Sequence, residues 1–309
     1  MRLVAPFPLV AHRSQIRLAA RVEAVFPFKD ENPTLRTPIV TLLLMVINVA
    51  VYFLIQPVEI NAGTQFTFET AAIPDEITSG EPLSQIEFCE VLGPDAAAVG
   101  AEAVCAAPTN AAVFPDKNVF VAALSSMFLH GGLLHLGGNM LFLWVFGNNI
   151  EDHLGRFKYL IFYLIAGVVA TIAHIAGDPD SIIPVVGASG AVAGVMGAYL
   201  VWFPWARIKT LALIILLDLK AWMVLAFWFG SQFFISPADG VAWLAHVGGF
   251  VFGAIIAALA RGSEGFRQQL WEHKYMTLNP TATTGSWDPR FGGREVLADG
   301  TTPSWHPGA

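Results

Sequence analysis

Two residues of this chain could together carry out nucleophilic chemistry. Ser189 lies in the run Gly187-Ala188-Ser189-Gly190 at the start of one long apolar stretch, and His246 lies near the start of another. A histidine can remove the proton of a serine hydroxyl and so make its oxygen a nucleophile. Ionisable groups inside a bilayer are costly, and they are therefore functional candidates. The pair can act only if the elements that carry it bring both side chains to the same depth.

The composition predicts that these elements are membrane-spanning helices. Of the 309 residues, 55% are hydrophobic and 13% are charged, whereas a soluble domain carries about 25% charged residues. Long apolar stretches with few charges mark the spans, although the fifth stretch is short by this standard. The predicted spans are Pro38–Gln56, Leu133–Ile150, Phe157–Ala176, Ser189–Phe203, Ala221–Ile235 and Val241–Ala260. We therefore expect an all-α polytopic membrane protein with six transmembrane helices.

The basic residues predict how this bundle is oriented. If the N-terminus lies inside, Lys117 is the one basic residue of 17 that lies outside, as the preference of Lys and Arg for the cytoplasmic side requires. Residues 1–37 and 261–309 are then cytoplasmic tails, the second of them disordered. The membrane domain covers 38–260 and includes a long acidic outer loop at 57–118. We expect a multi-pass protein of a cell membrane, with a bacterial inner membrane favoured.

Two segments outside the spans carry further expectations. Both cysteines, Cys89 and Cys105, fall in the outer loop, where an oxidising compartment would allow a disulfide. The alternative is two unpaired thiols in a flexible loop. The apolar run Leu211–Leu217 is too short to span and has basic residues on both sides, which predicts an interfacial segment.

The predicted topology places polar groups of three spans in one shallow layer. The second, fourth and sixth spans begin at the outer face, so His135, Asn139, Ser189 and His246 all lie within about two helical turns of it. His135 and Asn139 are four residues apart and share a helix face. Two donors on one face, opposite a nucleophile, could form an oxyanion hole. The alternative is that they only hydrogen-bond between helices.

Small residues predict that the fourth and sixth spans pack closely. Gly190 lies on the fourth span, and Gly249 and Gly253 lie four residues apart on the sixth, with His246 three residues before the first of them. Small residues at this spacing let helix backbones approach closely in lipid. Close approach is what a hydrogen bond between Ser189 and His246 requires.

The position of Ser189 at a helix N-terminus adds a possible third oxyanion donor. Free backbone amides and the positive end of the helix dipole lie there, and both could stabilise an oxyanion. Gly187 and Gly190 would let the turn come close to a substrate backbone. An ordinary role as helix N-cap is the alternative for Ser189.

Three short motifs together resemble those of the rhomboid intramembrane serine proteases. They are Gly187-Ala188-Ser189-Gly190, His135-x-x-x-Asn139 and Ala245-His246-x-x-Gly249. The resemblance runs from about residue 26 to residue 260.

The resemblance implies a role for each matching residue. Ser189 would be the nucleophile and His246 its general base, without an acidic third member. His135, Asn139 and the backbone amide of Ser189 would stabilise the oxyanion. His130 would support the rim of the site. Glu151, with the following Gly155-Arg156, would be structural.

This sequence departs from the family pattern in two places. Many relatives have an aromatic residue four positions after the serine, stacked on the catalytic histidine, and here this residue is Ala193. His246 must then be oriented by Trp243 or by a residue on another span. Val121 and Ala122 stand where some members have a Trp-Arg pair. These departures bear on substrate range and rate more than on the chemistry.

We therefore expect a serine endopeptidase that cleaves transmembrane segments of other proteins near the outer face, through an acyl-enzyme. Its partners would be those segments and the lipid bilayer, with no cofactor, metal or nucleic acid. One rival is a catalytically inactive relative that binds transmembrane segments, and a second is a transporter. A metal site of His130, His135 and His246 is a third, although no Cys or carboxylate joins them.

Overall fold

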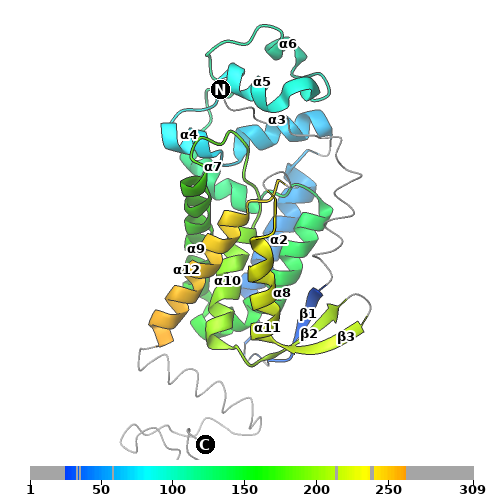
Figure 1. Ribbon diagram of the computed structural model, residues 1–309, viewed down its shortest axis with the longest axis vertical. Coiled ribbons are helices and arrows are strands. Elements are labelled where there is room, and N and C mark those ends of the chain that lie inside the picture. The colour runs from blue at the N-terminus through cyan, green and yellow to red at the C-terminus, as the bar shows by residue number, and fades with distance from the viewer. Residues whose placement is uncertain are drawn as a thin grey trace, which may run out of the picture.

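The computed structural model describes residues 25–32, 34, 36–57, 59–212, 215–236 and 240–261. Most of the two predicted cytoplasmic tails lies outside these ranges. Within them the chain is mainly helical, and the helices form an elongated bundle with a group of shorter helices at one end and a small sheet at the other (Figure 1).

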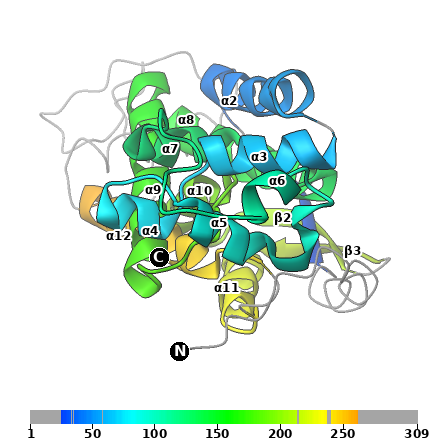
Figure 2. The same cartoon turned by 90° about the horizontal axis from the view of Figure 1, so that it is seen from above.

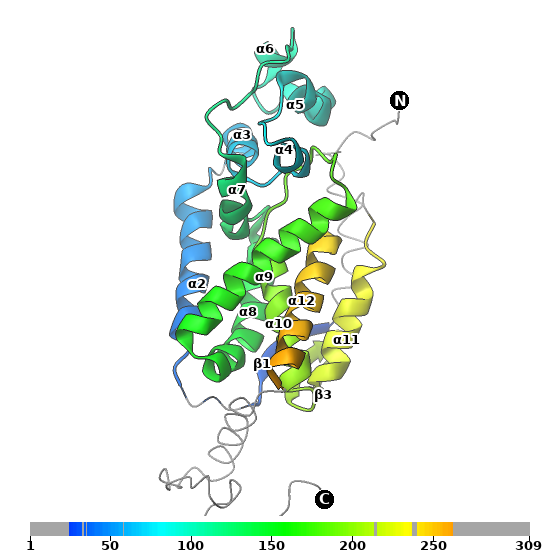
Figure 3. The same cartoon turned by 90° about the vertical axis from the view of Figure 1, so that its left-hand side faces the viewer.

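Helices form at all six positions that the sequence predicts as spans. They are α2 (Ile39–Ala50) continued by the π-helix η1 (Val51–Ile55), α8 (Leu133–Leu154), α9 (Arg156–Gly177), α10 (Ser189–Trp202), α11 (Ala221–Gln232) and α12 (Trp243–Arg261). Helix α10 is central and contacts α8, α9, α11 and α12 (Figure 3). Almost all of its residues are buried, as expected for a helix that is apolar on every side.

The described helices are those of a membrane protein. By length and composition α9 and α12 can each cross a membrane. Helix α8 passes the same test together with α7 (Val119–Ser125) and η3 (Ser126–Phe128), which are bent from it by 78°. Large apolar side chains such as Leu54 and Leu259 face outward and are exposed, which suits contact with lipid. The count of six spans and the orientation of the termini stay predictions.

The expectation of an all-α fold requires a correction. The described residues of Leu211–Leu217 lie in strands, and their interfacial position stays a prediction. A three-stranded antiparallel sheet in the order β1-β2-β3 is formed by β1 (Val25–Asp30), β2 (Arg207–Ala212) and β3 (Ile215–Lys220). Along β2, Ile208 and Thr210 are buried while Arg207, Lys209 and Leu211 are more exposed. This is the period of two that marks a half-buried strand. Strand β1 also shows that part of the predicted tail 1–37 belongs to the fold.

The predicted outer loop is a folded unit, which we call the cap (residues 59–118). It contains α3 (Ile60–Thr70), α4 (Pro74–Ser79), α5 (Gln85–Leu92), the 3-10 helix η2 (Gly93–Ala96) and α6 (Glu102–Cys105). Seen from above, these helices lie over the end of the bundle (Figure 2). The cap has its own core of buried apolar residues, among them Phe68, Ile73, Leu83, Phe88, Leu92 and Val99. A flexible loop is therefore the wrong description of this segment.

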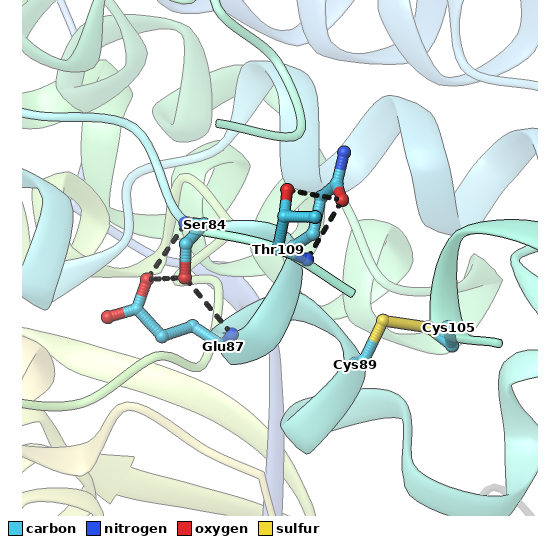
Figure 4. The surroundings of a disulfide bond; sticks show 6 residues. Ser84, Glu87, Cys89, Cys105 and Thr109 are labelled. Carbon is cyan, nitrogen blue, oxygen red and sulfur yellow. Dashed lines mark hydrogen bonds between the residues drawn. A yellow bond between two sulfur atoms is a disulfide. The ribbon is translucent and has the colours of Figure 1, made fainter. Parts of the chain in front are cut away.

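A disulfide joins Cys89 on α5 to Cys105 on α6 (Figure 4), which decides between the two alternatives that the sequence leaves open. Helix α5 begins with a capping box, in which Ser84 accepts the backbone N–H of Glu87 while the Glu87 carboxylate accepts the backbone N–H of Ser84. The disulfide and the capping box both stabilise α5, which has only eight residues.

A β-bridge and a side-chain hydrogen bond fasten the cap to the bundle, and a buried ion pair stabilises the cap itself. Lys117 pairs with Glu76, and both side chains are almost fully buried. Burial raises the pKa of Glu76 and lowers that of Lys117, since a low-dielectric site disfavours both charges. Ala72 forms a β-bridge with Val185, and the Ser125 hydroxyl donates to the carbonyl of Thr70 at 2.6 Å. The cap is therefore attached to the segment that leads into Ser189.

At the opposite end of the bundle, carboxylates hold the termini of other elements. The Glu151 carboxylate accepts the backbone N–H groups of Val40 at 2.9 Å and Thr41 at 2.7 Å, so α8 satisfies free amides at the start of α2. Glu151 therefore has the structural role that the resemblance implies. Asp30 on β1 accepts the Tyr199 hydroxyl at 2.6 Å, which links the sheet to α10.

Candidate active site

Ser189 and His246 meet between α10 and α12. Ser189 is the first residue of α10, and its Oγ lies 2.8 Å from Nε2 of His246. The N-cap position of this helix is occupied by Ala188, so Ser189 is not the N-cap that the alternative interpretation required. The structure thus brings together the two side chains that the sequence proposes as nucleophile and base, and both are partly buried.

Backbone contact between α10 and α12 sets this short distance. A Cβ atom on Gly249 would lie 2.1 Å from the carbonyl oxygen of Gly190, far inside van der Waals contact. Side chains larger than hydrogen would therefore separate the two helices and the pair they carry. The close packing predicted from Gly190, Gly249 and Gly253 is confirmed.

The second ring nitrogen of His246 is hydrogen-bonded by a residue that lies outside the sequence motifs. Nδ1 lies 2.7 Å from Oε1 of Gln232, the last residue of α11. The ring of Trp228, one turn earlier on α11, lies 5.8 Å from the imidazole. Helix α11 therefore supplies both the polar and the aromatic neighbour of His246. Ala193, which stands where many relatives have an aromatic residue, is buried and has no ring to stack on the imidazole. In the sequence, the signal for this contact is that a polar residue, a glutamine, lies near the end of an apolar stretch.

His135 lies against the turn that precedes Ser189. A Cβ atom on Gly187 would be 2.8 Å from both Cε1 and Nε2 of His135, and Gly187 has φ +123°, a conformation that favours glycine. The backbone N–H of Gly131 donates to Nδ1 of His135 at 3.4 Å. A neutral imidazole has one proton, so this bond leaves it on Nε2, the nitrogen beside Gly187. His135 can therefore donate a hydrogen bond next to Ser189.

Asn139 is buried one helical turn below His135 on α8. Its Nδ2 donates to the backbone carbonyl of His135 at 3.1 Å. An amide nitrogen has two hydrogens, and the second is not used in this bond. The shared face predicted for His135 and Asn139 is confirmed, and His135 lies against the turn that precedes Ser189.

His130 supports the entrance to α8. Its ring lies 5.3 Å from that of His135. Its backbone N–H donates to Oε1 of Gln56 at 2.9 Å, and its carbonyl accepts Nε2 of Gln56 at 3.1 Å. This double contact ties the end of η1 to the segment before α8, so His130 is a neighbour of the site rather than part of the Ser189–His246 pair.

A small cavity touches the nucleophile. Its volume is about 20 Å³, and Gly187, Ser189, Gly190 and Thr171 are among the residues that line it. This is enough for about one water molecule. A larger cavity of about 280 Å³ lies at the other end of α8, between Arg36 and Arg156, and takes no part in the arrangement around Ser189.

Together these features define a helical membrane protein with a serine–histidine pair between two closely packed helices. Residues 117–263 match the family model of the rhomboid domain. This part of the chain is therefore a rhomboid domain. All the candidate site residues lie within the matched range.

Relatives from bacteria and from mitochondria show the same likeness. The chain is 33% identical over 139 residues to rhomboid protease GluP of Bacillus subtilis, covering 45% of this chain and 25% of that protein. It is 30% identical over 147 residues to the mitochondrial rhomboid protein 1 of Saccharomyces cerevisiae, covering 46% and 36%. It is 32% identical over 145 residues to the human mitochondrial presenilin-associated rhomboid-like protein, covering 42% and 35%. The chain thus spans about a quarter to a third of the length of these relatives.

Proposed function

We propose that this protein is an intramembrane serine endopeptidase that cleaves transmembrane segments of other membrane proteins. The observation that carries the proposal is the distance of 2.8 Å between Ser189 Oγ and His246 Nε2. This is the contact that a general base needs in order to activate a serine nucleophile. The similarity to rhomboid protease GluP supports the same activity.

In the proposed reaction His246 Nε2 takes the proton of the Ser189 hydroxyl while Oγ attacks a peptide carbonyl. The tetrahedral intermediate collapses, the C–N bond breaks, and His246 returns the proton to the leaving amine. The product is an acyl-enzyme on Ser189. Water then attacks the ester with His246 again as base, and Ser189 is released.

Three donors are available for the oxyanion of this intermediate. The backbone N–H of Ser189 lies at the N-terminus of α10, where amides have no partner within the helix. Nε2–H of His135 lies beside Gly187. The second amide hydrogen of Asn139 completes the set proposed from the sequence. Donors fixed in place before the reaction stabilise the developing charge without reorganisation.

We further propose that the site opens to the outer face of a multi-pass cell membrane, with both termini in the cytoplasm and a bacterial inner membrane favoured. The cap lies at the same end of the bundle as Ser189 and contains the Cys89–Cys105 disulfide. Disulfides persist in oxidising compartments. The distribution of Lys and Arg supports the same orientation.

The proposed partners are transmembrane segments that unwind near the outer face. A helical backbone hides its carbonyls in hydrogen bonds, so cleavage requires local unwinding, and Gly, Pro or small residues near the membrane edge would favour it. Helix α11 is the candidate gate for their entry, since it lies at the edge of the bundle (Figure 3).

An inactive relative that only binds transmembrane segments is the second candidate. Binding alone would not require a serine hydroxyl bonded to an imidazole whose other nitrogen is also bonded. This geometry favours the enzyme.

The decisive experiment compares cleavage of a model transmembrane substrate by the purified protein and by Ser189→Ala and His246→Ala. We expect both substitutions to abolish cleavage, and a fluorophosphonate probe to label Ser189 only in the wild type. Ser126→Ala is the matched control, because the Ser126 hydroxyl donates to the carbonyl of Ala123 and not to His246. Cleavage that persists without the Ser189 hydroxyl would refute the mechanism, and a wild type that neither cleaves nor labels would favour the binding protein.

A further inference from the structure

Both ring nitrogens of His246 have a hydrogen-bond partner, and only the contact with Ser189 takes part in the proposed reaction. Nε2 faces Ser189 Oγ at 2.8 Å, and Nδ1 faces Gln232 Oε1 at 2.7 Å. Gln232 is 4% exposed. A buried polar side chain at this position requires partners for each of its atoms, and those partners show what Gln232 does.

The amide of Gln232 is oriented by contacts within α11. Its Nε2 donates to the carbonyl of Trp228 at 3.0 Å and to the Ser231 hydroxyl at 3.2 Å. Both amide hydrogens are therefore used on the last turn of the helix. The carbonyl oxygen Oε1 is the atom that faces His246, and it can only accept. Nδ1 of His246 must then be the donor.

This assignment fixes the tautomer of His246. A neutral imidazole has one proton, and a proton on Nδ1 leaves the lone pair on Nε2, where Ser189 can donate to it. A general base for Ser189 requires this form. In the serine–histidine–aspartate arrangement an aspartate performs the same task, whereas here a neutral amide does so. An uncharged acceptor avoids the cost of burying a carboxylate in a membrane protein.

We propose that Gln232 is a positioning residue that holds His246 in the tautomer and orientation needed to activate Ser189. The inference rests on the proposed proteolytic function and adds a third member to its pair. It also assigns to α11 a part in the chemistry that the motifs on α8, α10 and α12 do not show.

The packing of α11 on α12 supports a defined register for this contact. Trp228 and Gln232 are four residues apart on one face of α11, and His246 and Phe250 are four apart on one face of α12. The Trp228 ring lies 5.8 Å from that of His246 and 6.0 Å from that of Phe250. The aromatic contacts place the helices so that Gln232 reaches Nδ1.

The test uses two substitutions at Gln232 and one control. Gln232→Met keeps the length of the side chain and removes the acceptor, and Gln232→Glu keeps an acceptor oxygen. Gln85→Met makes the same chemical change in the cap, where the Gln85 amide bonds to Thr109. For each full-length protein, kcat and KM for a model transmembrane substrate and the rate of fluorophosphonate labelling of Ser189 are measured, together with the melting temperature.

We expect Gln232→Met to lower kcat and the labelling rate by about 10²-fold, the scale of general base catalysis, while KM changes little. Gln232→Glu should recover most of this loss, and Gln85→Met should behave as the wild type. Folded Gln232→Met with a wild-type labelling rate would overturn the proposal, and so would folded Gln232→Glu that is no more active than Gln232→Met. If Gln232→Met does not fold, Gln232→Glu still tests the proposal. A Gln232→Glu protein that folds but is inactive would contradict the acceptor role of residue 232. Failure of the wild type itself to label would refute the proposed function instead.

Discussion

The α-carbon of Gly253 on α12 faces the carbonyl oxygen of Gly194 on α10 so closely that a Cβ atom on Gly253 would lie 1.9 Å from that oxygen. This contact lies one turn below the one between Gly249 and Gly190. Because two successive contacts of this kind are between backbone atoms, the backbones themselves set the distance between the two helices. The distance between Ser189 and His246 follows from it.

Gly253→Val should therefore inactivate the protein without touching the site. The added side chain forces α10 and α12 apart, and a displacement of about 1 Å at the reacting groups can cost about 10²-fold in rate. We expect fluorophosphonate labelling of Ser189 to fall by about this factor, with a lower melting temperature. Gly137→Ala on α8 is the control, since a Cβ there meets nothing within 4 Å. Equal labelling of the two variants would contradict the packing account.

Asn139→Ala should lower kcat by about 10²–10³-fold if Asn139 donates to the oxyanion, the usual effect of removing one such donor. KM should change little, because the interaction forms mainly in the transition state. The measurement is steady-state cleavage of a model substrate. An unchanged kcat would remove Asn139 from the site and leave His135 and the Ser189 amide as the donors.

Asp30→Asn should change how stability depends on pH. Burial raises the pKa of Asp30 to about 6, although hydrogen bonds from Tyr199 and Asn32 partly oppose this shift. Because the folded-state pKa is above the unfolded value of about 3.9, the folded state favours the protonated acid. Its contribution to stability is complete below about pH 4 and is lost as the pH rises to about 6, a change of about 3 kcal/mol at most.

The check on this prediction is the melting temperature of wild type and Asp30→Asn between pH 4 and pH 7. The wild type should lose more stability than the variant over this range. Glu76 and Asp75 also have raised pKa values, so the difference between the two proteins, rather than either curve, carries the test. Parallel curves would show that Asp30 does not titrate as proposed.

Cys105→Ser should destabilise the cap more than the membrane bundle. The disulfide closes a loop with a sequence separation of 16 residues, and such a loop is worth about 3 kcal/mol in the chain-entropy account. We expect proteolysis within residues 59–118 to accelerate while Ser189 still labels. Alkylation of the wild type without a reductant provides the independent check, and modification of both Cys89 and Cys105 would show that they are not bonded.

The Ser189–His246 pair could be predicted because its evidence is local. Each motif sits on one apolar stretch, and alternation of span direction brings the stretches to one depth. The glycine spacing on α10 and α12 then requires close contact, which the structure confirms. None of this depends on pairing distant segments in detail.

Gln232, the sheet and the cap could not be predicted because their evidence is non-local. A glutamine at the end of α11 has many possible neighbours until the helices are packed. Strand β1 pairs with a strand far along the chain, with Val25 opposite Ala212. The alternation along β2 covers too few residues to be recognised within an apolar run. The cap core collects single apolar residues from several short helices, none of which forms a long periodic pattern.

The two backbone contacts between α10 and α12 have a mechanical consequence. We expect helices joined in this way to move together, so a substrate segment would reach Ser189 by displacing another neighbouring helix. If that neighbour is α11, its departure removes the acceptor from Nδ1 of His246, and its return restores it. Substrate entry and bond cleavage would then be separated in time, and the proposed protease would be inactive while the gate is open.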